Sequence, residues 1–171
     1  MEQVTFVEFD ESLAGYFKAF NRHWLEKYFY TEPIDEEMLS NPKAFFVDKG
    51  GYIFFAKLGN EIAGTFALMK MEEGIFELSK MAVDEKYHGR KIGNQMLAFC
   101  LQKAKVLGAH KLILYSNTIL ANAIHLYRKY GFIEVPAGNT EYKRSDIKME
   151  VNLIPGSVFE QKGDNPEILA V

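Results

Sequence analysis

The chain has 171 residues, of which 48% are hydrophobic and 14% aromatic, and its formal net charge is -3. This composition excludes an intrinsically disordered chain and predicts one domain that can bury a sizeable core. The near balance of 20 basic and 23 acidic residues gives no reason to expect nucleic acid as a partner. The one cysteine, Cys100, excludes an intrachain disulfide and a zinc site built on cysteines.

The first residues, MEQVTFVEFDE, do not show the basic and apolar pattern of a signal peptide. No uninterrupted apolar run approaches the ~20 residues needed to span a bilayer. A single cysteine also fits a reducing compartment. We therefore expect a cytoplasmic protein that does not act at a membrane.

Periodicity and turn residues divide the chain into short helices and strands. Phe17, Phe20 and Trp24 lie near helical spacing, and Gly59-Asn60 forms a two-residue turn between two β-rich runs. In chain order, we expect a strand at 4–9, helices at 13–29 and 33–39, a hairpin at 51–71, a strand at 74–83, a helix at 94–107, a strand at 111–116, a helix at 120–130, and strands at 132–135 and 142–154.

These elements predict one α+β domain over residues 1–154, with helices on both faces of a mixed, mostly antiparallel sheet. We expect about six or seven strands and about four helices, with a right-handed parallel strand-helix-strand unit in the middle. The tail at 155–171 is rich in turn residues and has no predicted structure. One apolar stripe marks the helix at 94–107, and it consists of Met96, Leu97, Cys100, Leu101, Ala104 and Leu107.

The segment YHGRKIGNQML follows a predicted strand and leads into that helix. The first turn of a helix offers backbone N–H groups and partial positive charge to an anion. Gly89 and Gly93 allow close approach of the backbone, and His88, Arg90 and Lys91 add charge or hydrogen bonds. The pattern favours phosphate binding, although it is neither a P-loop nor a three-glycine dinucleotide motif. An ordinary strand-to-helix turn with solvated cations is the alternative.

Four segments, ELSKMAV, YHGRKIGNQML, LYSN and NAIHLYRKYGF, together resemble the GNAT superfamily of N-acetyltransferases. The family's central pattern falls on residues 88–93. It consists of Arg or Gln, two variable residues, Gly, a variable residue, and then Gly or Ala. His88 replaces the Arg or Gln, and Lys91 replaces the first glycine. A second family pattern appears as Ala123-Ile124, Leu126-Tyr127 and Gly131-Phe132. The resemblance extends from about Tyr52 to Leu153 and implies a GNAT-like fold of the small bacterial type.

The resemblance implies that acetyl-CoA is the co-substrate and that no metal is needed. The anion at the loop would be the pyrophosphate of coenzyme A, and the pantetheine arm would lie where the strand before the loop splays from the next strand. The family's usual pantetheine-binding asparagine falls on Leu120 here, so Asn117 or Asn122 could substitute, or each is a turn or capping residue. The implied cofactor-binding residues are Met81, Ala82, Val83, His88, Gly89, Arg90, Lys91, Ile92, Gly93, Asn94, Asn117 and Asn122.

Two side chains are candidates for acid–base chemistry. Glu77 matches a catalytic glutamate of some superfamily members and is our candidate base, while Tyr127 matches the family's helix tyrosine and is our candidate acid. By strand alternation, Glu77 would share a face with Met81 and Val83, although a strand bulge would change this. The alternatives are a Glu77 that is solvated or paired with a lysine such as Lys80 or Lys111, and a Tyr127 that is a core residue with a tethered hydroxyl.

The acceptor site is less defined. His23 and Trp24 lie on the first helix, which shapes the acceptor pocket in this family, although an aromatic stripe is more often core. The run EPIDEE could attract a cationic acceptor, but acids are also favoured in a solvated first helical turn.

The leading hypothesis is an acetyl-CoA-dependent N-acetyltransferase that acts on a primary amine of a small molecule or peptide by direct attack in a ternary complex. The alternative is a non-catalytic acyl-CoA sensor or interaction module with the same fold. Superfamily members are often dimers, which leaves a homodimer open.

Overall fold

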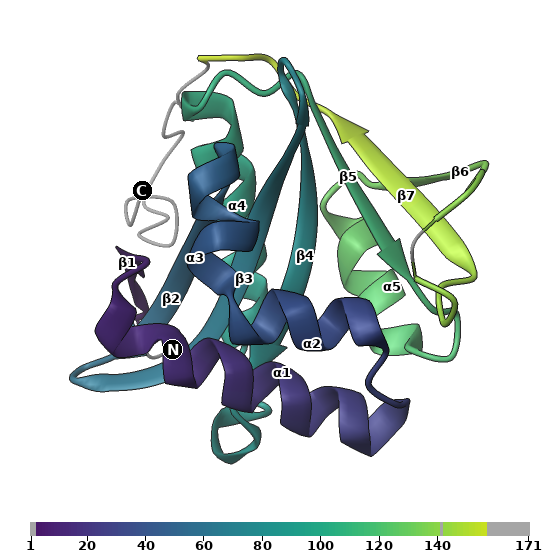
Figure 1. Cartoon of the computed structure of the whole chain (residues 1–171). Coiled ribbons are helices and arrows are strands. Elements are labelled where there is room, and N and C mark those ends of the chain that lie inside the picture. The colour runs from purple at the N-terminus through teal and green to yellow at the C-terminus, as the bar shows by residue number, and fades with distance from the viewer. Residues whose placement is uncertain (1–2, 141, 157–171) are drawn as a thin grey trace.

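One mixed sheet runs through the computed structural model, which describes residues 3–140 and 142–156. Seven strands from these residues lie in the order β1-β2-β3-β4-β5-β7-β6 (Figure 1). The strands are β1 (Thr5–Glu8), β2 (Tyr52–Leu58), β3 (Glu61–Glu72), β4 (Ile75–Val83), β5 (Lys111–Ser116), β6 (Ile133–Val135) and β7 (Ile147–Asn152). The pair β4 and β5 is parallel and the other neighbours are antiparallel, which confirms the predicted fold class.

Helices cover both faces of the sheet. The described residues form α1 (Ala14–Tyr28), α2 (Pro33–Ser40), α3 (Pro42–Phe45), α4 (Ile92–Val106) and α5 (Ala121–Lys129). The sequence did not predict α3, since the expected helices were those at 13–29, 33–39, 94–107 and 120–130. Proline is favoured at the first position of a helix, and Pro42 begins α3 in this way. The tail predicted from residue 155 lies, from residue 157 on, outside the described residues.

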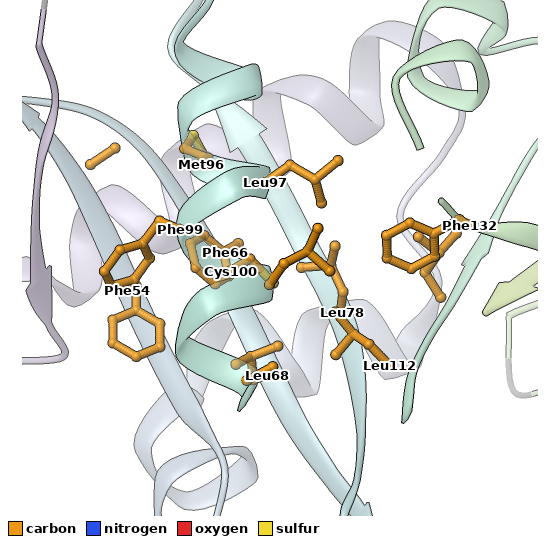
Figure 2. Close-up of a cluster of buried hydrophobic side chains, with 14 of the residues drawn as sticks. Phe54, Phe66, Leu68, Leu78, Met96, Leu97, Phe99, Cys100, Leu112 and Phe132 are labelled. Carbon is orange, nitrogen blue, oxygen red and sulfur yellow. The ribbon is translucent and has the colours of Figure 1, made fainter. Parts of the chain in front are cut away.

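Two hydrophobic clusters sandwich the sheet, one under α4 and one under α1, α2 and α3. The predicted stripe of α4 forms the centre of the first cluster, where Met96, Leu97 and Cys100 are fully buried. Figure 2 shows Met96, Leu97 and Cys100 of α4 in one cluster with Leu78 of β4, Phe54 of β2 and Phe66 of β3. Burying each such side chain contributes about 1.5–3 kcal/mol, so this packing fixes the start of α4 relative to β4.

The strand boundary expected at 142 was wrong, and the helix expected from about residue 94 begins at Ile92. Helix α4 begins two residues early because Lys91, in a left-handed conformation with φ of 59°, turns the chain into the helix. Strand β7 begins at Ile147, five residues late. Residues 142–146 are held outside the sheet by hydrogen bonds, and the Asp146 carboxylate accepts two of these from the backbone and hydroxyl of Thr118.

The strands β4 and β5 pair at their N-terminal ends and then separate (Figure 1). Only Ile75 to Glu77 of β4 pair with β5 among the described residues. On its other side β4 stays paired with β3 as far as Val83, but the register shifts between the pairs at Ser79 and Ala82. Lys80 lies in this bulge with φ of 55°. A bulge bends a strand, and here it bends β4 where the gap to β5 opens.

Candidate active site

The glycine loop lines a basic cavity of about 540 Å³ between α4 and α5. The loop turns sharply because Gly89 (φ 80°) and Lys91 (φ 59°) both adopt left-handed conformations. Four of the described lining residues can carry positive charge and none of them is acidic. These four are His88, Lys91, His125 and Lys129. Together with the first turn of α4, whose Gly93 and Asn94 line the cavity, they make this cavity suited to an anion.

The predicted loop residues have different roles in this geometry. Ile92 is buried in the core, whereas Gly93 and Asn94 line the basic cavity. A Cβ built on Gly93 would come no closer than 4.0 Å to another residue, at Leu126 Cδ2, so packing within the protein does not require glycine there. Arg90 does not line the cavity, and its guanidinium lies 5.4 Å from the ring centroid of Tyr87.

A second cavity, of about 250 Å³, lies in the gap between β4 and β5. It adjoins the basic cavity, because Val83, Gly93, Ala123 and Leu126 line both. We call it the inner pocket. Both candidate acid–base residues, Glu77 and Tyr127, line it. A ligand anchored by its phosphates at the loop can therefore extend along the splayed strand to these two side chains.

Glu77 is buried at the wall of the inner pocket. It is 4% exposed, and the Tyr142 hydroxyl donates a hydrogen bond to its Oε2 at 3.2 Å. The interpretation of Glu77 as a solvated residue is therefore wrong. The proposed lysine partners bind other acids, since Lys80 pairs with Asp35 and Lys111 pairs with Glu150.

Tyr127 lies on α5, where its ring packs against Phe132 with centroids 5.8 Å apart. No hydrogen bond joins its hydroxyl to another described residue, so the expected tether of a core tyrosine is not observed there. Burial and, to a lesser degree, the neighbouring Cys100 raise the pKa of Tyr127 to about 12. The phenol therefore stays protonated at neutral pH and can donate a hydrogen bond into the inner pocket.

A buried ionic cluster, which the sequence did not predict, borders the inner pocket. Lys80 Nζ lies 2.5 Å from Asp35 Oδ1, and the guanidinium of Arg144 binds both oxygens of Asp35 at 2.6 and 2.9 Å. Arg144 also contacts Glu32 Oε2 at 2.7 Å. The expectation that EPIDEE is a solvated turn is wrong for its first and fourth residues, since Glu32 is 5% and Asp35 0% exposed.

The cluster remains charged despite its burial. Burial by itself would raise the pKa of Asp35, but hydrogen bonds from Arg144 and the charge of Lys80 outweigh it and hold the pKa below the ordinary 3.8. Burial lowers the pKa of Lys80, and the attraction of Asp35 opposes this shift. The sequence signal for Glu32 and Asp35 was a capping box at the start of α2, which is present but did not predict burial.

Comparison with known proteins identifies the family. Residues 7–132 match the acetyltransferase (GNAT) family. The chain belongs to this family. It is 30% identical over 104 residues to the uncharacterized N-acetyltransferase YvbK of Bacillus subtilis, a match that covers 59% of this chain and 67% of that protein. The predicted resemblance is thus confirmed, and the protein is an acyltransferase of a family that uses coenzyme A.

Solved structures of GNAT proteins share the fold. An acetyltransferase of the GNAT family from Staphylococcus aureus Mu50 superposes with a TM-score of 0.77 at 21% identity, over 88% of this chain and 99% of that chain. A spermidine N-acetyltransferase from Vibrio cholerae in complex with CoA and spermine superposes with a TM-score of 0.69 at 17% identity, over 89% of this chain and 96% of that chain. At these identities the likeness supports the fold and not the acceptor.

The other predicted coenzyme contacts of this GNAT protein occupy the edges of the two cavities. Met81 and Val83 line the inner pocket. Ala82 and Val83 pair with β3 on one side, which leaves their other side toward the gap. His88 Nε2 already lies 3.1 Å from the carbonyl oxygen of Val83. Any contact of that carbonyl with a ligand would therefore compete with the His88 ring.

The two candidate asparagines differ. Asn117 lines the inner pocket, but its side chain donates to the Arg144 carbonyl at 2.7 Å and accepts from the Ile119 backbone at 3.0 Å. It therefore holds a turn, as the alternative interpretation expected. Asn122 is exposed and lines the basic cavity. Leu120, the family's usual asparagine position, lines the inner pocket with an apolar side chain.

The aromatic residues of α1 serve both packing and the site. Trp24 lines the inner pocket and also packs against the core cluster under α1. His23 lies outside both cavities, and its Nε2 contacts Glu85 at 3.0 Å.

In the described part of the chain, no group of His, Cys, Asp or Glu side chains could hold a metal ion. None of the described helices is long and apolar enough to cross a membrane.

Proposed function

We propose that this GNAT-family protein is an N-acetyltransferase that moves the acetyl group of acetyl-CoA to a primary amine of a small molecule or peptide. The amine would attack the thioester directly, while both substrates are bound. The observation that carries this proposal is the continuity of the two cavities, one lined by basic side chains and the other by the buried Glu77 carboxylate and the Tyr127 phenol. Holding two reactants together in such a site is itself a large source of rate acceleration.

Each candidate residue has a defined task in this proposal. The amine nitrogen forms a bond to the acetyl carbon, and the bond from that carbon to sulfur breaks. Glu77, directly or through a water molecule, accepts the proton that the amine loses, and Tyr127 gives a proton or a hydrogen bond to the departing sulfur. General acid–base assistance of this kind contributes roughly 10²–10⁴-fold to the rate.

The loop fits the pyrophosphate of coenzyme A. Gly93 lines the junction of the two cavities. A Cβ added there would have Leu126 Cδ2, at 4.0 Å, as its nearest neighbour from another part of the protein, so a ligand can approach the backbone at this position. Lys91 departs from the family's glycine, yet it adopts the left-handed conformation that glycine takes without strain. Lys91 therefore still supplies a backbone N–H group to the loop, as a glycine would.

Two similar proteins support amine acetylation, one by its name and the other by the molecules bound in its structure. The Bacillus subtilis relative is named an N-acetyltransferase. The Vibrio cholerae structure contains CoA and the polyamine spermine in a protein of the same fold. An amine acceptor for the present chain is consistent with both.

The first test is a thermal melt of the full chain with and without acetyl-CoA. At a ligand concentration near 100 times the dissociation constant, binding stabilises a protein by about 2.7 kcal/mol, which is roughly 5–10 °C for a chain of this size. A saturable shift would be followed by an assay of amine-dependent thiol release. Coenzyme binding without turnover over a broad amine panel would instead favour the non-catalytic sensor, and no shift at millimolar acetyl-CoA would contradict the proposal.

A further inference from the structure

The inner pocket is small, and its apolar lining residues include a group of large side chains beside a comparable number of polar ones. Its volume of about 250 Å³ lies below the range of about 300–1,000 Å³ that is usual for drug-sized ligands. Large apolar side chains from α1, β5 and the approach to α5 form its walls. They are Trp24, Leu25, Phe29, Leu114 and Leu120. The pantetheine arm would enter this pocket from the basic cavity, past Val83 and Gly93, which leaves the part beside α1 for the acceptor. An acceptor in that part needs an apolar body of modest size.

The charges of the pocket limit what else the acceptor can carry. Among the described lining residues, Glu77 is the one carboxylate, and Lys80 and Arg144 are the cations. Both cations are already bound to the carboxylate of Asp35, which does not line the pocket. An acceptor carboxylate would have to compete with this acid, because a buried cation holds its partner strongly.

A second ammonium group on the acceptor would have no carboxylate partner among the described residues of the pocket. Asp35 and Glu32 already compensate Lys80 and Arg144. Among the described lining residues, Glu77 is therefore the one carboxylate that could pair with an ammonium group. An unpaired charge in a poorly solvated site is disfavoured, and the described lining residues offer no second carboxylate for it. Polyamines are therefore poorly matched to this pocket, although the related Vibrio cholerae fold contains spermine.

We propose that the acceptor is a small monoamine with an apolar body, of the arylalkylamine or branched alkylamine class, and that Trp24 determines this preference. This inference rests on the proposed N-acetyltransferase activity. Trp24 and Phe29 form an aromatic wall, with ring centroids 5.7 Å apart and planes at 47°. The apolar body lies against this wall while its amine group reaches Glu77 and the acetyl thioester. The amine forms the amide bond, the carbon–sulfur bond breaks, and the amine proton passes to Glu77.

The test compares matched pairs of acceptors with the full chain and acetyl-CoA, with thiol release and product mass as readouts. Phenethylamine and phenylalanine differ by one carboxylate, and hexylamine and hexamethylenediamine differ by one terminal ammonium. We expect kcat/KM for each monoamine to exceed that of its charged partner by about 100-fold or more. Equal kcat/KM within either pair would overturn the inference and leave the proposed function intact, whereas no transfer to any amine would overturn both.

A variant series assigns the preference to Trp24. Trp24→Ala should lower kcat/KM for phenethylamine by about tenfold or more, mostly through KM, and should lower kcat/KM for ethylamine far less. Tyr16→Ala, on the same helix but outside the pocket, is the matched control and should lower neither. An equal loss with both amines would show that Trp24 is only structural, and would remove it as the specificity residue.

Discussion

The two cavities of the site are built in different ways. The basic cavity is lined mainly by the loop at 87–94, without Arg90, and by α5 from Asn122 to Lys129. We expect backbone N–H groups of the loop and the exposed cations to contact the anion there. The inner pocket is formed by side chains from α1, β4, β5, α5 and the segment 142–146, and a buried ionic cluster supports it. A backbone-built site tolerates side-chain changes at its surface, whereas a site built from interlocked side chains does not.

The two departures from the family's central pattern both lie in the basic cavity and not in the inner pocket. They are His88 and Lys91, and Lys91 adopts the left-handed conformation that glycine takes without strain. In the inner pocket, each charged group has a specific buried partner. We therefore expect substitutions to have large effects in the inner pocket and small effects at the loop, and the predictions below test this expectation.

The substitution Glu77→Gln should have the largest effect of all, and this effect is on catalysis. The substitution keeps the shape of the side chain and a hydrogen-bonding partner for Tyr142, but it removes the base. We expect kcat to fall by about 10²–10⁴-fold and the acidic limb of the pH–rate profile to flatten. The acetyl-CoA melt shift should be retained, which distinguishes lost chemistry from lost binding. An unchanged pH–rate profile would rule out Glu77 as the base.

Removing Asp35 should have the largest effect on stability. Asp35→Ala leaves Lys80 and Arg144 buried beside each other without their shared acid, and breaking a buried pair in this way costs about 3–5 kcal/mol. Chemical denaturation measures the difference. Glu36→Ala is the matched control, because Glu36 lies on the same helix in an exposed pair with Arg22 and should contribute about 0–1 kcal/mol. Equal losses in the two variants would contradict a structural role for the cluster.

The Asp35 carboxylate also predicts a pH dependence of stability. Its folded pKa lies below the ordinary value of 3.8, so the unfolded chain binds a proton more readily than the folded one. The stabilisation is therefore present above pH 3.8 and is lost as the pH falls through the lower, folded pKa. Asp35→Asn should lack this part of the acid-induced loss, which a comparison of denaturation curves at several pH values would detect.

The difference between the cavities also explains how far the sequence could predict the structure. Helical and strand periodicity placed most elements, and the glycines at 89 and 93 marked the loop because local spacing determines both. The ionic cluster joins Asp35 to Arg144, which are 109 positions apart, and no local pattern marks such a pair. The same contacts hold residues 142–146 outside β7, so the error at that strand and the missed cluster have one cause.

Tyr127→Phe should have a smaller effect than Glu77→Gln. The phenyl ring keeps its packing against Phe132, and only the hydroxyl is lost. We expect turnover to fall by about 10²-fold with little change in coenzyme binding. Because burial and Cys100 raise the pKa of Tyr127 to about 12, the loss should be constant over the assayed pH range below that value. Equal turnover in the two proteins would remove Tyr127 from the mechanism.

Gly93→Ala tests whether the loop is a ligand cradle or an ordinary turn. The added Cβ fits the protein, with Leu126 Cδ2 at 4.0 Å, and alanine favours a helix over glycine by up to about 1 kcal/mol. We expect unchanged or higher stability together with an about tenfold weaker affinity for coenzyme A, measured by calorimetry. Gly15→Ala, at the equivalent second position of α1, should match the stability change without altering affinity. Unaltered affinity in Gly93→Ala would favour the ordinary turn.

Lys91→Gly should have the smallest effect, and it should be stabilising. Lys91 has φ of 59°, a conformation that costs a residue with a Cβ about 1–2 kcal/mol and glycine almost nothing. Because glycine also gains entropy in the unfolded chain, we expect a net stabilisation of about 1 kcal/mol or less. Arg90→Gly removes the same charge from the adjacent position, which does not have positive φ, and should not stabilise the protein. If Lys91→Gly were no more stable than Arg90→Gly, the left-handed conformation of Lys91 would carry no strain. The conformation of the loop backbone would then not explain why a lysine is tolerated at the family's glycine position.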